Sequence, residues 1–292
     1  MLEATRHYVQ CLSPAGLHRI AYKQWGAPDN ARVLVCVHGV TRVSDDFDTM
    51  ARALAADYRV ICPDMAGRGR SDWLRNAQLY RIPQYVSDMV TLLARVCRHE
   101  EGGSVDWFGT SMGGLIGLGL ACLPGNPIGK LVLNDIGPTL DPAALRRIGD
   151  YIGQDMRFDT FEAGAKFIRD ISQPFGQHSE EEWHKLASDV LLQDKDGNWM
   201  RHYDLGLALP FRQATPESTQ ADQASLWAAY DAIRCPTLLV RGAQSDLLSR
   251  ETAAAMVARG PRARLVEIDG VGHAPTFIHA DQIAIVRDFL LA

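Results

Sequence analysis

Several features that place a chain in a functional class are missing from this 292-residue sequence. No run of about 18 apolar residues occurs, which is the length that a membrane-spanning helix needs. Basic residues are not in excess, since the formal net charge is −5. Nucleic-acid binding usually requires a basic surface. We therefore expect neither a membrane nor a nucleic acid among the partners of this protein.

Residue spacings typical of metal, redox and nucleotide sites are missing as well. The six cysteines are scattered singly without a C-x-x-C pair, and the histidines show no H-x-x-x-H spacing. No G-x-x-x-x-G-K-[ST] motif is present, and residues 67–69 match only a fragment of a dinucleotide fingerprint. We expect no metal and no cofactor, and we interpret the cysteines as buried thiols. The first ten residues mix acidic and basic side chains where a signal peptide needs an apolar block, which predicts a cytoplasmic location.

What the chain does contain is an alternation of apolar strands and helices. Residues 7–37 are rich in strand-forming patterns, and helix and strand then alternate up to Asp135. This rhythm predicts an α/β fold with a mostly parallel sheet covered by helices on both faces. Residues 138–222 show helices and loops without a convincing strand, and the core pattern resumes near residues 226–230. We therefore predict a core of residues 1–137 and 223–292 with an inserted helical cap, residues 138–222.

The most informative motif is Gly109-Thr110-Ser111-Met112-Gly113, a G-x-S-x-G pattern between a short apolar strand and a helix rich in glycine. A sharp turn from strand to helix holds such a serine in a strained conformation with its hydroxyl exposed above the sheet. The motif alone also fits a serine that caps a buried helix. The catalytic interpretation therefore needs an acid, a histidine and oxyanion donors.

An acid and a histidine follow in the order expected for such a serine. Asp246 lies in the loop after the apolar strand that ends at Gly242, and His273 lies in the glycine-bounded loop after the next strand. Ser111 would attack the substrate, His273 would take and return its proton, and Asp246 would orient the imidazole.

With these residues the chain resembles the α/β-hydrolase family over nearly its whole length. Two more segments carry the resemblance: an apolar strand that ends in His38-Gly39-Val40, and a D-x-x-G-x-G-x-S loop that begins at Asp64. The resemblance implies a mostly parallel eight-stranded sheet flanked by helices. It also implies an oxyanion hole formed by the backbone amides of Val40 and Met112.

Other residues compete for the same roles. Asp135 ends the strand after the serine motif, where some family members place their acid, but Asp246 matches the usual position better. His279 opens the final helix and is a weaker candidate for the base than His273. We interpret His38 as a hydrogen-bonded structural histidine and Asp269 as a turn residue.

Residues expected near the active-site pocket indicate the kind of substrate. Arg42 follows the oxyanion loop, where a cation could attract a substrate oxygen, although solvated or ion-paired arginines are more common. The cap holds many aromatic residues, which indicates a mostly apolar site for a small molecule. Because Ser111 replaces the aspartate of dehalogenases and epoxide hydrolases in the family, we expect a serine hydrolase of carboxylic esters, such as short-chain esters, lactones or hydroxy-acid oligomers.

Two other functions stay open at this point. Family members with a serine also hydrolyse carbon–carbon bonds in ring-cleavage diketones, and a few act as ligand receptors without turnover. The sequence leaves the oligomeric state undetermined.

Overall fold

The computed structural model describes residues 3–97 and 103–292 of the chain. Its centre is an eight-stranded sheet with the strand order β1-β2-β4-β3-β5-β6-β10-β11. Its strands are β1 (Thr5–Ser13), β2 (Gly16–Trp25), β3 (Val33–Val37), β4 (Arg59–Pro63), β5 (Val105–Thr110), β6 (Ile128–Asn134), β10 (Thr237–Gly242) and β11 (Arg264–Ile268).

The direction of the strands confirms the predicted fold class. β1 and β2 form an antiparallel hairpin, and β2 also pairs antiparallel with β4. All pairs from β4 through β3, β5, β6 and β10 to β11 are parallel. The carboxyl ends of these parallel strands share one edge of the sheet, which is where α/β folds place their ligands.

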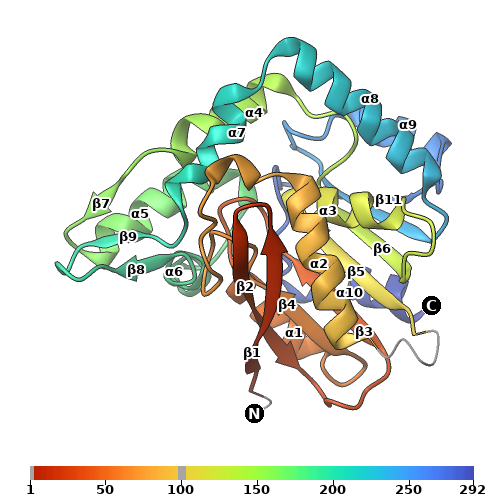
Figure 1. Ribbon diagram of the computed structural model, residues 1–292, viewed down its shortest axis with the longest axis horizontal. Helices are drawn as coiled ribbons and strands as arrows, with labels where there is room; N and C mark the ends of the chain where they lie inside the picture. The colour runs from red at the N-terminus through yellow and green to blue at the C-terminus, as the bar shows by residue number, and fades with distance from the viewer. Residues whose placement is uncertain (1–2, 98–102) are drawn as a thin grey trace.

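Helices cover both faces of the sheet (Figure 1). The helices are α1 (Asp48–Leu54), α2 (Ile82–Val96), α3 (Met112–Ala121), α4 (Pro142–Ile152), α5 (Phe161–Ile171), α6 (Glu180–Ser188), α7 (Leu209–Gln213), α8 (Pro216–Ala232), α9 (Arg250–Ala258) and α10 (Ala280–Leu291). Successive residues of a strand point to opposite faces. Val35 and Trp107 accordingly pack into one core with α2, α3 and α9, whereas Cys36 and Phe108 pack into a second core with α1 and α10.

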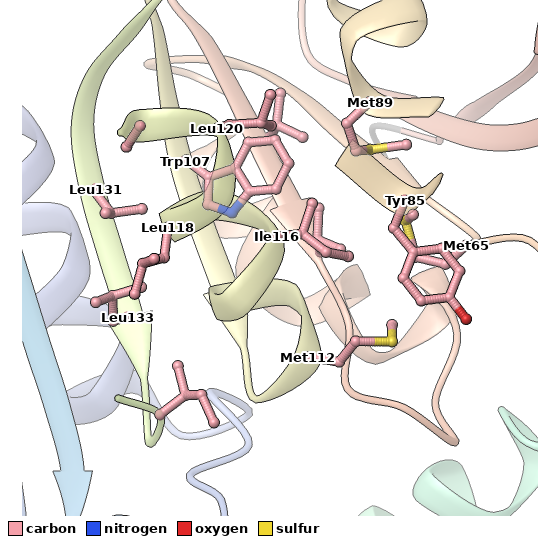
Figure 2. Packing of buried hydrophobic residues seen from close by; sticks show 14 of the residues in the cluster. Met65, Tyr85, Met89, Trp107, Met112, Ile116, Leu118, Leu120, Leu131 and Leu133 are labelled. Atoms are coloured by element: carbon pink, nitrogen blue, oxygen red, sulfur yellow. The ribbon is translucent and has the colours of Figure 1, made fainter. Parts of the chain in front are cut away.

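The larger core is organised around the indole of Trp107 on β5. Figure 2 shows this ring among Leu131 of β6 and the α3 side chains Leu118 and Leu120. Its Nε1 donates a hydrogen bond of 3.0 Å to the carbonyl oxygen of Gly113. A Cβ atom at Gly117 would lie 2.3 Å from the same nitrogen, so only glycine leaves room for the indole under α3. This packing fixes α3 against the centre of the sheet.

The inserted segment differs from the predicted purely helical cap. Between α4 and α7 it contains a three-stranded antiparallel sheet in the order β7-β9-β8, built from β7 (Arg157–Phe158), β8 (Leu191–Gln193) and β9 (Trp199–Arg201). In Figure 1 this sheet lies beside α5 and α6 at the left, away from the central sheet. The strands were not expected because they are only two or three residues long, too short to show an alternating pattern.

The predicted end of the cap at residue 222 falls inside α8, which continues to Ala232. Tyr230 near its end is fully buried, and its hydroxyl donates a 2.7 Å hydrogen bond to the carbonyl oxygen of Met256 in α9. The second half of α8 therefore packs with the core.

Among the residues that the structure describes, no helix has the length and apolar character needed to cross a lipid bilayer.

We predict that Trp107→Phe destabilises the fold by roughly 2–3 kcal/mol. The smaller ring removes the hydrogen-bond donor to Gly113 and leaves a cavity beneath α3. Urea unfolding followed by circular dichroism measures the change. Trp73→Phe is the matched control, because Trp73 is 52% exposed and its replacement should change stability by less than about 0.5 kcal/mol. Equal stability of both variants would contradict this account of the core.

Candidate active site

Ser111 lies at the turn from β5 into α3, as the sequence motif predicts. Its backbone has φ 52° and ψ −116°, a strained conformation for a residue other than glycine. Its amide donates a 3.0 Å hydrogen bond to the carbonyl oxygen of Asn134 at the end of β6. The turn is possible because α3 comes very close to β3: a Cβ atom at Gly113 would lie 2.0 Å from the carbonyl oxygen of Val37.

His273 lies in the loop after β11 and contacts Ser111, as predicted. Its Nε2 is 2.9 Å from Ser111 Oγ, which is hydrogen-bond distance for a hydroxyl that donates to an imidazole. Its Nδ1 is 2.8 Å from Oδ2 of Asp135. One imidazole therefore connects a hydroxyl to a carboxylate, the arrangement that activates a serine nucleophile.

The carboxylate of Asp135 is fully buried and is held by several donors. Oδ1 accepts a 2.9 Å hydrogen bond from the amide of Gly242, and Oδ2 accepts one of 2.6 Å from the hydroxyl of Ser245 in addition to the contact with His273. Asp135 has a φ of 55°, which turns its side chain out of β6 toward the loop after β10. Both oxygens are thus fixed before a substrate arrives.

The prediction that Asp246 orients His273 is therefore wrong for this structure. The Asp246 side chain is 43% exposed and forms an ion pair with Arg147 of α4. That hydrogen bond with Arg147 is the largest cause that lowers the pKa of Asp246, and the charge of His273 has a smaller effect. Ser245, one residue earlier, turns inward to Asp135, so the following side chain points outward.

Of the two residues predicted to form the oxyanion hole, Val40 lines the same pocket as Ser111, and Met112 follows Ser111 at the start of α3. In the described part of the chain, neither the Val40 amide nor the Met112 amide donates a hydrogen bond to a protein acceptor. Buried Arg68 holds both residues: its Nε donates to the Val40 carbonyl oxygen at 2.8 Å, and its Nη2 lies 3.2 Å from Met112 Sδ. Arg68 belongs to the D-x-x-G-x-G-x-S loop, for which sequence reasoning expected only tight turns.

A pocket of about 890 Å³, including its open mouth, lies over Ser111 and His273. Core loops and the inserted segment both contribute to its wall, which is mostly apolar. The wall consists of Gly39, Val40, Thr41, Arg42, Thr110, Ser111, Arg147, Ile148, Tyr151, Ile168, Ile171, Ser172, Pro174, Phe175, Val190, Arg201, Tyr203, His273 and Ala274. Arg147 and Arg201 belong to no motif, and nothing in the sequence singles them out, whereas Tyr203 is one of the aromatic residues of the predicted cap.

Arg42 does line the pocket, but its charge is already compensated. Its guanidinium forms two hydrogen bonds with Asp46, of 2.8 and 2.6 Å, and donates a third to the carbonyl oxygen of Leu186. A role of Arg42 in substrate binding stays a prediction.

The remaining candidates occupy structural positions. His279 lies at the N-terminus of α10, 3.3 Å from Glu182, and Asp269 lies in the turn after β11. Neither contacts Ser111. A buried cluster of Cys11, His18 and Asp88 has potential metal-ligand atoms within 4.8 Å of one another. This cluster shares no residue with the pocket over Ser111, and His18 forms a hydrogen bond of 3.0 Å with Asp88.

His38 is the structural histidine that the sequence suggested. It is fully buried, its Nδ1 donates a 2.7 Å hydrogen bond to the Gly39 carbonyl oxygen, and its Nε2 accepts one of 3.0 Å from the Met65 amide. The bond from the Met65 amide needs the neutral ring, because a protonated Nε2 cannot accept a hydrogen bond. Burial lowers the pKa of His38 to about 4.

We predict a stability loss in acid from this group. The unfolded chain would bind a proton at His38 below about pH 6.5, whereas the folded protein resists protonation down to about pH 4. Stability is therefore fully present above pH 6.5 and falls by roughly 3 kcal/mol as the pH drops to about 4. Urea unfolding at several pH values measures this change. His38→Gln should flatten the curve in this window, and parallel curves would contradict the assignment.

Comparison with known proteins agrees with this geometry. The family model described as "Alpha/beta hydrolase family" matches residues 34–286, so the chain belongs to the α/β-hydrolase family. Within that family it is an enzyme, a hydrolase of carboxylic esters.

Relatives cover the chain almost completely. It is 58% identical over 285 residues to a 3-hydroxybutyrate-oligomer hydrolase of Cupriavidus necator, an alignment that covers 97% of this chain and 96% of that protein. An esterase of Mycobacterium tuberculosis is 27% identical over 93% of this chain and 86% of its own length. A crystal structure of an α/β hydrolase of Novosphingobium aromaticivorans superimposes with a TM-score of 0.85 at 33% identity, covering 100% of this chain and 99% of that one.

Proposed function

We propose that the protein hydrolyses ester bonds in short linear oligomers of hydroxy acids, with Ser111 as the nucleophile. The observation that carries the proposal is the 2.9 Å contact between Ser111 Oγ and His273 Nε2 at the base of a capped pocket. The similarity to a 3-hydroxybutyrate-oligomer hydrolase supports the substrate class. We further propose a cytoplasmic enzyme that binds neither nucleic acid nor a membrane, because its charge and composition favour neither partner.

The proposed reaction is a two-step acyl transfer. Ser111 Oγ attacks the ester carbonyl carbon while His273 Nε2 takes the hydroxyl proton, and buried Asp135 stabilises the imidazolium. The amides of Val40 and Met112 stabilise the developing oxyanion. The bond to the alkoxy oxygen then breaks, and His273 gives the proton to the leaving alcohol.

Water completes the cycle. His273 removes a proton from a water molecule, which attacks the acyl carbon and forms the second tetrahedral intermediate. The bond to Ser111 Oγ breaks, the serine recovers its proton, and the acid product leaves. Every proton passes through one imidazole, so the step needs no further co-reactant.

The wall of the pocket fits a small aliphatic substrate. Ile148, Ile168, Ile171, Phe175 and Val190 provide apolar surface opposite the catalytic serine. All of them belong to the predicted cap, residues 138–222. We propose that this segment acts as the cap of the active site and limits the acyl chain to short lengths.

The first test is hydrolysis of p-nitrophenyl esters from acetate to decanoate beside Ser111→Ala. We expect turnover that favours short chains and a loss of roughly 10⁶-fold in kcat in the variant, because the nucleophile is gone. Ester hydrolysis retained by Ser111→Ala would contradict the assignment. Inactivity on esters, together with Ser111-dependent bleaching of a vinylogous diketone acid, would instead indicate carbon–carbon hydrolysis.

A second test assigns the acid. Asp135→Asn should lower kcat by about 10⁴-fold, because an amide cannot stabilise the imidazolium and favours the wrong ring tautomer. Asp246→Asn is the matched control at the other predicted position and should change kcat by about twofold at most. The reverse ranking would return the acid role to Asp246.

A further inference from the structure

The wall of the active-site pocket carries positive charge without a facing acid. Three arginines line it, Arg42, Arg147 and Arg201, and no aspartate or glutamate does among the described residues. Two of these charges are compensated by carboxylates outside the pocket wall: Arg42 pairs with Asp46 and Arg147 with Asp246. The remaining arginine, Arg201, therefore determines the net charge of the pocket wall.

Arg201 has no such partner. It ends β9, is only 5% exposed, and forms no ion pair with any residue that the structure describes. Its guanidinium donates to the carbonyl oxygens of Tyr151, at 2.9 Å, and of Gln154, just beyond the end of α4. Asp155 is the one carboxylate among the described residues that raises the pKa of Arg201, and it is exposed and lies 3.6 Å from Arg157.

Such an environment is unfavourable for the charged guanidinium. Burial lowers the pKa of Arg201, because the charged form loses hydration. The carbonyls at a helix end offer partial negative charge only. A buried cation without a full counter-charge is costly, and a bound anion would remove that cost.

A tyrosine with an unpaired hydroxyl packs against this cation. Tyr203 lines the same pocket, is 2% exposed, and its ring centroid is 5.0 Å from the guanidinium carbon of Arg201. Within the described residues its hydroxyl has no hydrogen-bond partner. Burial raises the pKa of Tyr203, so the hydroxyl keeps its proton and stays a donor. A carboxylate in the pocket could accept from the guanidinium with one oxygen and from the hydroxyl with the other.

We propose that Arg201 and the Tyr203 hydroxyl form a subsite for the free carboxylate of the substrate, so that the enzyme selects acidic over neutral esters. This inference rests on the proposed function and makes it more specific. In a linear hydroxy-acid oligomer, the only free carboxylate lies on the alkoxy side of every ester bond. A carboxylate bound at Arg201 therefore belongs to the leaving alcohol. The distance of an ester bond from the carboxyl end of the oligomer then determines whether it is cleaved.

Two trimers of 3-hydroxybutyrate test the proposal on the unmodified enzyme. One keeps its carboxylate and is acetylated at the hydroxyl end, whereas the other has a free hydroxyl and an N-methylamide in place of the carboxylate. We expect kcat/KM to be about tenfold to a hundredfold higher for the first, the range for hydrogen bonds to a charged group. Equal values for both trimers would overturn the subsite. Absence of Ser111-dependent cleavage of either would overturn the proposed function instead.

Variants separate binding from a purely structural role. Arg201→Gln should reduce the ratio of the two kcat/KM values to about one, Arg201→Lys should keep part of it, and Tyr203→Phe should lower it severalfold. If Arg201 only holds α4, Arg201→Gln lowers both values together and leaves the ratio intact, which would contradict the proposal. Arg157→Gln, on neighbouring β7 and outside the pocket, is the matched control and should keep the ratio of the unmodified enzyme.

A further measurement needs no variant. Butyrate should inhibit hydrolysis of a neutral ester competitively, and butyramide should need at least tenfold higher concentration for the same effect. Equal inhibition by the acid and the amide would overturn the proposal even if the Arg201 variants did not fold.

Discussion

The active site depends on the closeness of α3 to β3. Gly113 lies so near the Val37 carbonyl that no side chain fits between them, and Trp107 holds the same helix from beneath through the Gly113 carbonyl. This contact fixes the N-terminus of α3, and with it the Ser111 turn and the Met112 amide. The strain stored in the backbone of Ser111 persists because the packed core around it offers no room for relaxation. The geometry of the proposed catalytic site is thus a consequence of core packing.

The core and the inserted segment contribute different groups to the pocket. The core supplies the hydroxyl, the imidazole, the carboxylate and the two amides, whereas the insertion supplies most of the apolar wall and two of the three arginines, Arg147 and Arg201. Excluding water from such a wall strengthens every charge interaction inside it. In the proposed mechanism, the core therefore carries out the reaction, and the inserted segment selects the substrate.

The sequence predicts the sheet and the closeness of Ser111 to His273 because each has a local signature: an apolar run, a small-residue motif or a glycine-bounded loop. The choice between Asp135 and Asp246 has no local signature. Both residues follow a parallel strand at the same edge of the sheet, and what separates them is the sign of one backbone angle at Asp135 and the inward turn of Ser245. The role proposed for Arg201 could not be predicted from the sequence either. Its strand is only three residues long, and its distance from carboxylates is a property of the folded structure.

The position of Asp135 has a mechanical consequence. Asp135 directly follows β6, where the chain leaves the core for the inserted segment. A displacement of α4 could therefore move the residue that orients His273. Its carboxylate, however, accepts hydrogen bonds from the Gly242 amide and the Ser245 hydroxyl, and both residues follow the insertion in the sequence. All three partners of this carboxylate, Gly242, Ser245 and His273, belong to the core. The inserted segment could therefore change in length without breaking the hydrogen bonds that align His273.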